Sequence, residues 1–332
     1  MNKKQLLKTL ISIGFLLLII IVFKKSLVEA MYEMRFIRIW QIALISLMAI
    51  VFQICDGLNY KIMTQTKGTG LTRWEGISCA FYSSFFKVVT FGSGSAAGTI
   101  YYMNNRGIKL SRGTSISALS YMFHKLTIAV LAIFFLIVQF KDFHSIYNNY
   151  FSTFLISLAI AILIAILFLT ICISKRLHTL LVKCMNKLNK KGKLSHIIDT
   201  LTEYFIGLEE SSTELLKDKS CVCSIILRDI IKMLAIYSIP YIILAPIHTI
   251  TGIQLLGITA VSCAVASVLP APAGIGSTEV AFLLFFANIV PKKNILSCAL
   301  LYRFMTFLFP GVIGGTIIGM NKIKKTLVHQ DN

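Results

Sequence analysis

The sequence predicts an all-α polytopic membrane protein, with about six full spans and two re-entrant hairpins in two halves of inverted topology. Of its 332 residues, 56% are hydrophobic and only 14% are charged, and the mean hydropathy is +0.77. Long apolar runs alternate with short polar loops, and two of the runs are interrupted by glycine or proline, at 91–98 and 269–276. This combination is typical of a membrane protein whose broken segments line an internal site.

The formal net charge of +19 is spread over the loops between the apolar runs. We interpret it as a topological signal and expect no nucleic-acid partner. The eight cysteines lie mostly within apolar runs, and only Cys221 and Cys223 are close together. A single C-x-C lacks the second pair of ligands that a zinc site needs, so we expect no metal and no other cofactor.

The first predicted half covers residues 1–140. We expect full spans at 6–23, 39–55 and 116–138, close to the length of about 20 residues that a bilayer crossing needs. Residues 77–100 are apolar but carry Lys87 and the stretch FGSGSAAG, which predicts a re-entrant hairpin. A cleaved signal peptide is the alternative for 6–23, because Val28-Glu29-Ala30 resembles a cleavage site; the length of the run favours a retained span.

The second predicted half covers residues 150–320 and repeats this order. We expect full spans at 151–173, 223–246 and 295–320, and a re-entrant hairpin at 255–290. The amphipathic segment 175–220 is expected to lie on the anionic cytoplasmic leaflet. Arg228 and Asp229 are close to a predicted helix end, so an interfacial ion pair is expected there, and residues 321–332 should form a basic cytoplasmic tail.

The distribution of lysine and arginine predicts the orientation. The loops at 59–75, 104–112 and 175–220 and both termini are basic and are placed in the cytoplasm, whereas 139–150 and 247–254 are not. Lys292 and Lys293 are an exception to this rule, because they fall on the external side. Each interrupted segment then starts and ends on one side, and three crossings per half give the halves opposite orientations, as in secondary transporters.

The second interrupted segment, LPAPAGIGSTEVAFLLFF at Leu269–Phe286, contains the predicted site. Its prolines remove backbone donors, and Gly274 and Gly276 loosen the chain between them and the next helix. That helix is expected to start at Ser277, with open amides, the positive end of its dipole and Glu279 in its first turn. A carboxylate and free amides at membrane depth predict a binding site.

Charged residues on other segments are expected to join it. Arg303, on the last predicted span, is expected either to neutralise Glu279 in a structural ion pair or to bind a lipid phosphate. His124 and Lys125 are neighbours in the third span, and at least one should face the protein interior. Lys87 and Arg106 are expected to reach the cytoplasmic headgroups, with specific lipid recognition as the alternative.

The first interrupted segment leaves two interpretations open. Ser93, Gly94 and Gly98 would present amides and hydroxyls to a phosphate, or they would allow helices to pack closely. No catalytic residue is predicted. The predicted substrate-binding residues are Glu279, Arg303, Gly274, Gly276, Ser277, Ser93, Gly94, Gly98, Arg106 and Lys125.

The two breaks also carry a family resemblance. The stretch FGSGSAAGTIYYMNNRGIKLSRGTSISAL at Phe91–Leu119 and the stretch LPAPAGIGSTEVAF resemble the two signatures of the lysylphosphatidylglycerol synthase transmembrane family. The resemblance implies the lipid-flipping membrane unit of the bacterial multiple peptide resistance factor, or a free-standing relative. Where many relatives have a Glu-Arg pair, this chain has Phe123-His124-Lys125, which puts an acidic role there in doubt.

We therefore expect a flippase-like protein that moves phosphatidylglycerol, lysyl-phosphatidylglycerol or a lipid-linked headgroup between leaflets of the bacterial cytoplasmic membrane. The alternatives are a phosphatidylglycerol lysyltransferase that needs a separate catalytic partner, and an ion-coupled carrier of a soluble solute. Segment 175–220 is too short for an acyltransferase domain, so enzyme activity is left open. The expected partners are membrane phospholipids, a separate aminoacyltransferase or glycosyltransferase, and a second copy of the chain.

Overall fold

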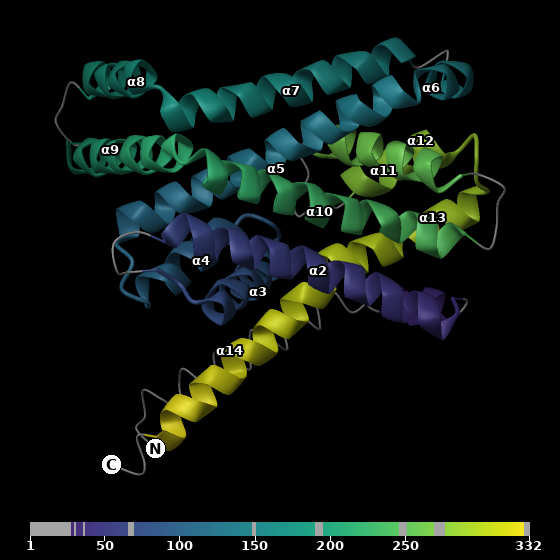
Figure 1. The fold of residues 1–332 in the computed structure, drawn as a ribbon, viewed down its shortest axis with the longest axis horizontal. Helices are drawn as coiled ribbons and strands as arrows, with labels where there is room; N and C mark the ends of the chain where they lie inside the picture. The colour runs from purple at the N-terminus through teal and green to yellow at the C-terminus, as the bar shows by residue number, and fades with distance from the viewer. Residues whose placement is uncertain are drawn as a thin grey trace.

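Helices form all the regular structure in the described part of the chain. The computed structural model describes residues 28–29, 31–35, 37–65, 70–147, 151–189, 195–245, 251–268 and 276–328 (Figure 1), and no strand occurs among them. The predicted all-α class is therefore confirmed. The predicted span 6–23 and its signal-peptide alternative lie outside the described residues.

The helices follow one another in three groups. The first group is α2 (Ile39–Thr64), α3 (Arg73–Val89), α4 (Ser95–Asn104) and α5 (Leu110–Val138). The second is α6 (Phe140–Tyr147), α7 (Phe151–Ile173), α8 (Lys175–Leu188) and α9 (Ser195–Lys217). The third is α10 (Lys219–Leu244), α11 (Gly252–Ala266), α12 (Ser277–Phe286), α13 (Lys292–Arg303), the π-helix η3 (Phe304–Leu308) and α14 (Phe309–Val328).

Three helices in the described part are long and apolar enough to cross a bilayer: Ile39–Thr64, Leu110–Val138 and Lys292–Met320. They contain or overlap three of the predicted spans. α7 has 23 residues and no charged side chain, whereas α10 has 26 residues and carries Arg228, Asp229 and Lys232. α11 and α12 are shorter apolar helices. Together with the long apolar helices, they support a multi-pass helical membrane protein.

Side-chain caps begin several of these helices where the sequence changes from polar to apolar. At α3, the Thr72 hydroxyl accepts from the Glu75 amide and the Glu75 carboxylate accepts from the Thr72 amide, which forms a capping box. Thr251 and Gln254 form the same device at α11. Asp218 caps α10 by accepting from the Cys221 amide at 3.0 Å.

The first and third groups share one order of elements: a long helix, a pair of short helices, and a second long segment. α2 and α10 run antiparallel, because Gln41 at the start of α2 donates to the carbonyl of Ile242 near the end of α10, and Asn59 meets Asp229 at the other end. α3 packs on α14, and α11 packs on α5, so each group's short helix contacts the other group's long segment. An inverted repeat would produce this arrangement; the membrane orientation of the halves stays a prediction.

α3 is held between α2 and α14 by direct backbone contact. Gly57 of α2 lies against the backbone of Gly76 and Ile77 at the start of α3. Gly314 of α14 lies against the carbonyl group of Phe81, and a methyl group there would overlap it. Small residues at such crossings let helix backbones approach closely, which fixes α3 firmly within the fold.

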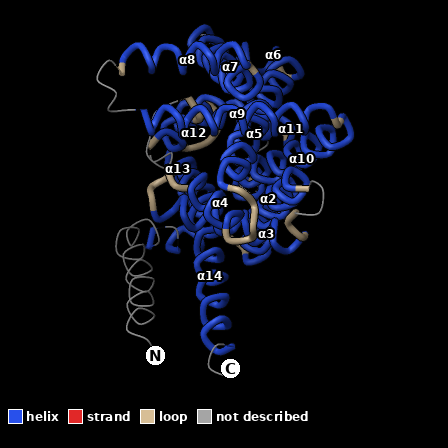
Figure 2. The backbone as a smooth tube through the Cα atoms, turned by 90° about the vertical axis from the view of Figure 1, so that its left-hand side faces the viewer, coloured by secondary structure: helices blue, strands red, loops and turns tan. Residues whose placement is uncertain are grey.

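The amphipathic segment 175–220 packs on other helices of the protein, and its position on the leaflet surface stays a prediction. It forms two helices, α8 and α9, joined by an ion pair of 3.4 Å between Lys175 and Glu209 and by stacking of His178 on Phe205, with ring centroids 4.7 Å apart. α9 packs along α5 and α7, and its Ile198 and Leu208 are buried. The apolar face of α9 therefore packs on other helices of the protein. By contrast, α14 extends away from the helical body (Figures 1 and 2).

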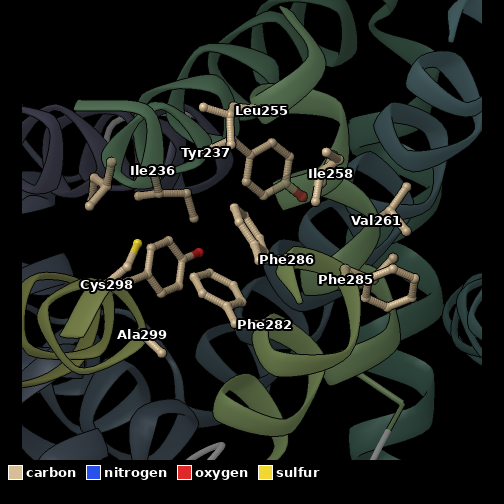
Figure 3. Packing of buried hydrophobic residues seen from close by; sticks show 14 of the residues in the cluster. Ile236, Tyr237, Leu255, Ile258, Val261, Phe282, Phe285, Phe286, Cys298 and Ala299 are labelled. Carbon is tan, nitrogen blue, oxygen red and sulfur yellow. The ribbon is translucent and has the colours of Figure 1, made fainter. Parts of the chain in front are cut away.

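The largest buried cluster surrounds α12. Phe282 and Phe286 lie with Tyr237 of α10 and with residues of α11 and α13 (Figure 3). The Phe282 ring centroid is 5.1 Å from that of Phe286 and 5.1 Å from that of Tyr302. This packing anchors α12 and so fixes the position of its first turn.

Candidate functional site

The site begins at the first turn of α12. Glu279 uses both carboxylate oxygens there: Oε2 accepts from the Gly276 amide at 3.0 Å, and Oε1 accepts from Arg303 Nη1 at 2.9 Å. Gly276 has a φ of 86°, a backbone conformation that residues other than glycine rarely adopt. The next residue, Ser277, is buried. The carboxylate therefore ties the start of α12 to the end of α13.

The ion pair lies between the interior and the surface. The Arg303 side chain is 14% exposed and that of Glu279 is 19% exposed, so both charged groups have lost much of their hydration. The prediction that these two residues pair is confirmed by this contact. Whether they bind lipid stays a prediction.

A π-helix follows Arg303 directly. π-helices are rare in proteins, but those that occur are often found at functional sites, because they change the direction of side chains within a helix. Two cations lie near the ring of Phe307 on η3. Arg303 Cζ is 6.0 Å and Lys87 Nζ is 5.7 Å from the ring centroid. Lys87 thus comes from the end of α3 to the same ring as Arg303, and it brings the first break to the neighbourhood of the second.

Lys125 of α5 approaches the other end of the second break. Its Nζ donates to the carbonyl of Ser267 at 3.2 Å, just past the end of α11, where a cation interacts favourably with the helix dipole. His124 contacts the Phe52 ring of α2, with centroids 6.2 Å apart. The prediction that at least one of these neighbours faces the interior is therefore confirmed.

The second break is thus flanked by charges from three elements. Glu279 and Arg303 lie where α12 begins, and Lys125 lies where α11 ends. One carboxylate and two cations give this region a net charge of +1. A guanidinium can bind a phosphate through two parallel hydrogen bonds. The predicted residue Gly274 lies outside the described residues.

The first break is packed closely. The Gly94 amide donates to Thr90 Oγ1 at 2.5 Å, and the Gly98 amide donates to the Gly94 carbonyl at 2.9 Å, so both amides have acceptors within the chain. A Cβ on Gly98 would lie 2.8 Å from Phe86 Cβ. Ser93 is exposed and donates to the Thr90 carbonyl at 2.9 Å. Between the two interpretations, this geometry favours close packing over a phosphate-binding nest.

Arg106 lies apart from both breaks. It follows α4, forms an ion pair with Glu75 at the start of α3, and stands over the Tyr102 ring with Cζ 5.4 Å from the centroid. The structure therefore does not bring Arg106 together with Glu279, Arg303 and Lys125.

A group of buried charges between α2 and α10 was not among the predicted site residues. Lys232 forms ion pairs of 2.7 Å with Asp229 and with Asp56, and Lys232 and Asp229 are each 1% exposed. The predicted interfacial pair of Arg228 with Asp229 is wrong, because Asp229 points to Lys232 and Arg228 donates to the Ser224 carbonyl. Charges of both signs inside apolar segments were the available signal.

Possible metal ligands are not clustered in the described ranges. No group of three or more His, Cys, Asp or Glu side chains there could hold a metal ion.

Comparison with known families assigns the chain. A family model described as the lysylphosphatidylglycerol synthase TM region matches residues 5–314, which include both breaks and the buried charges. A comparison with curated proteins gave no match. Since the family model covers nearly all of the 332 residues, this multi-pass membrane protein belongs to the lysylphosphatidylglycerol synthase transmembrane family.

Proposed function

We propose that the protein moves a phospholipid between the leaflets of its membrane, with the headgroup passing the second break. The observation that carries the proposal is the largely buried ion pair of Glu279 and Arg303 at the start of α12. A charged pair at the end of an interrupted membrane helix is a functional site by default. The family's description supports a role connected with membrane lipids.

The charges suit anionic and zwitterionic headgroups. Arg303 would hold the phosphate through its guanidinium, and Lys125 would add a second cation from the other side of the break. When a phosphate binds, Arg303 would donate some of its hydrogen bonds to the phosphate while it stays paired with Glu279. The Glu279 carboxylate would attract the ammonium groups of a lysylated lipid. These contacts would replace the hydration of the headgroup while the acyl chains remain in the bilayer.

The interrupted helices are long enough to take a headgroup deep into the membrane. α11 has 15 residues and α12 has 10, which correspond to about 22 Å and about 15 Å of helix. Either length reaches towards the middle of a hydrocarbon core of about 30 Å. Rocking of the two halves about this position would expose the site to each leaflet in turn.

The family's description favours one further candidate. As part of a lysylphosphatidylglycerol synthase system, the chain would work beside a separate lysyltransferase and carry its lipid product. In that case, purified protein would prefer lysyl-phosphatidylglycerol over phosphatidylglycerol, and the transferase reaction would need the second protein.

The test uses purified protein in liposomes that carry fluorescent phosphatidylglycerol or lysyl-phosphatidylglycerol. Dithionite added outside bleaches the outer leaflet, and lipid movement bleaches the remainder. We expect wild-type protein to accelerate loss of the protected fraction, and Glu279→Gln or Arg303→Ala to abolish the acceleration. The matched controls are Glu209→Gln on α9 and Arg176→Ala on α8, away from the break.

A charge exchange separates lipid binding from mere structural pairing. The double variant Glu279→Arg with Arg303→Glu can restore the ion pair, but it moves the guanidinium to another element. If the pair is only structural, this variant regains part of the activity that either single variant loses, the remainder reflecting the lost Gly276 amide contact of Glu279; if Arg303 binds phosphate, it stays inactive. Wild-type liposomes that match empty ones for every lipid would refute translocation and direct attention to a soluble solute or a catalytic partner.

A further inference from the structure

Three ionisable side chains are enclosed between α2 and α10, the two corresponding long helices of the halves. Lys232 Nζ lies 2.7 Å from Asp56 Oδ1 and 2.7 Å from Asp229 Oδ1. The side chains of Lys232 and Asp229 are 1% exposed, whereas that of Asp56 is 18% exposed. Two carboxylates share one ammonium, so this trio has a net charge of −1 when all three groups are ionised.

Two buried oxygens in the same network accept no hydrogen bond from the described part of the chain. Asn59 Nδ2 donates to Asp229 Oδ1 at 2.7 Å, yet Asp229 Oδ2 and Asn59 Oδ1 have no partner. A buried oxygen without a donor is unfavourable, and a buried unbalanced charge is more so. A proton on Asp229 Oδ2 would remove the excess charge and turn that oxygen into a donor.

The surroundings leave Asp229 with one cation, which it shares. In the described part of the chain, no side chain of α9, α11 or α13 forms an ion pair or side-chain hydrogen bond with the trio. His124 of α5 and Lys232 both approach the Phe52 ring, at 6.2 Å and 5.5 Å from its centroid. The other charged and titratable groups that interact with a member of the trio are Cys55 and Tyr60 on α2, Cys79 and Lys87 on α3, and His124 on α5, with Arg228 next to Asp229 on α10.

We propose that Asp229 binds and releases a proton in each transport cycle, so that lipid movement by this protein is coupled to protons. This inference rests on the proposed lipid translocation. The step is a single protonation: H⁺ adds to Asp229 Oδ2, no other covalent bond changes, and Lys232 keeps Asp56 as its counter-ion. The trio thereby changes from a net charge of −1 to neutral.

The position of the trio explains how protonation affects movement. It joins α2 to α10, so rocking of the halves must rearrange it, and a neutral cluster costs less to rearrange in an apolar environment than a charged one. Asp56 offers the route from solvent, about 12 Å from the end of α2 at Thr64. Moving one anionic phosphatidylglycerol with one proton is also electroneutral, which avoids opposition by the membrane potential.

The first test detects the proton directly and needs no transport. Infrared difference spectra of purified protein are recorded across pH, in search of the carbonyl stretch of a buried protonated carboxyl. We expect this band in wild type and in the control Glu209→Gln, and its loss in Asp229→Asn. If Asp229→Asn does not fold, Asp229→Glu serves, because it must change the band's position. A band unaffected by changes at Asp229, or no band at all, would overturn the proposal.

The second test measures coupling in the same liposomes under a pH gradient, with the membrane potential collapsed. A difference of about one pH unit supports at most about a tenfold ratio of phosphatidylglycerol between leaflets, if one proton accompanies one lipid. We expect the protected fraction to follow the gradient in wild type and to reverse with it. Asp229→Asn has no proton to exchange at this site, so its protected fraction should not follow the gradient, and a fraction that still follows it would overturn the proposal.

The outcomes separate this inference from the proposed function. Wild-type protein that moves lipid regardless of the gradient would overturn proton coupling while leaving translocation intact. Wild-type protein that moves no lipid, yet shows the Asp229 band, would refute translocation and leave the proton site standing.

Discussion

At the residue scale, the charges inside the helical body link parts of the chain that are far apart in sequence. Asp56 and Lys232 are 176 residues apart, and Glu279 and Arg303 are 24 apart. The sequence shows that these residues interrupt apolar segments, which predicts that each needs a partner. It predicted the nearer pair correctly and missed the farther one, because nothing local indicates which faces of α2 and α10 meet.

The sharing of Lys232 between two carboxylates leads to a stability prediction. Lys232→Met should destabilise the protein by about 3–5 kcal/mol, because it leaves the buried Asp229 carboxylate, with the partly buried Asp56 beside it, without a cation. Asp229→Asn should cost far less, since it removes the excess negative charge. Thermal unfolding in detergent compares both variants with Lys175→Met, whose lysine is 81% exposed. A melting temperature of Lys232→Met equal to that of Lys175→Met would contradict the assignment.

At the element scale, the sequence located the two breaks but could not describe their state. Glycine-rich composition permits open amides as well as close packing. In the first break, Thr90 accepts a hydrogen bond from the Gly94 amide, and Phe86 packs on Gly98. At the second break, Glu279 accepts hydrogen bonds from both the Gly276 amide and Arg303. The difference depends on which elements cover each break, and covering elements come from distant parts of the chain.

Glycines of α14 provide a test of helix packing at this scale. Gly314→Ala should lower the melting temperature, because its methyl group would overlap the carbonyl of Phe81 on α3. Gly319→Ala is the matched control, since no atom lies within 4 Å of its added Cβ and alanine is the better helix former by about 1 kcal/mol. We expect the first variant to unfold earlier and the second to be unchanged or more stable. Equal behaviour of the two would argue against the contact of α14 with α3.

At the scale of the whole molecule, two groups of helices repeat one order and exchange contacts through α3 with α14 and α11 with α5. Such exchange means that α3 and α11 are each covered in part by the other group. The positive-inside rule adds the expected direction: loop 104–112 in the cytoplasm and loop 139–150 outside. The antiparallel contact of α2 and α10 is compatible with that assignment.

Single cysteines in a background with the eight native cysteines replaced test this orientation. Lys141→Cys should react with an impermeant maleimide in intact cells, and Asn105→Cys should react only after permeabilisation. Labelling with the opposite pattern would reverse the whole molecule, and labelling of both from one side would remove the inverted arrangement.

The sequence by itself determined the membrane class, the family, the positions of most helices and the two breaks, because apolar length, glycine and proline act locally on the backbone. It also identified Glu279 and Arg303, since a charge within an apolar segment stands out against its neighbours. Only the tertiary structure decided that Lys125 reaches the end of α11, that Arg106 lies elsewhere, and that Asp56, Asp229 and Lys232 form one group. Those contacts depend on how helices cross, and a crossing is set by side-chain packing over the whole fold.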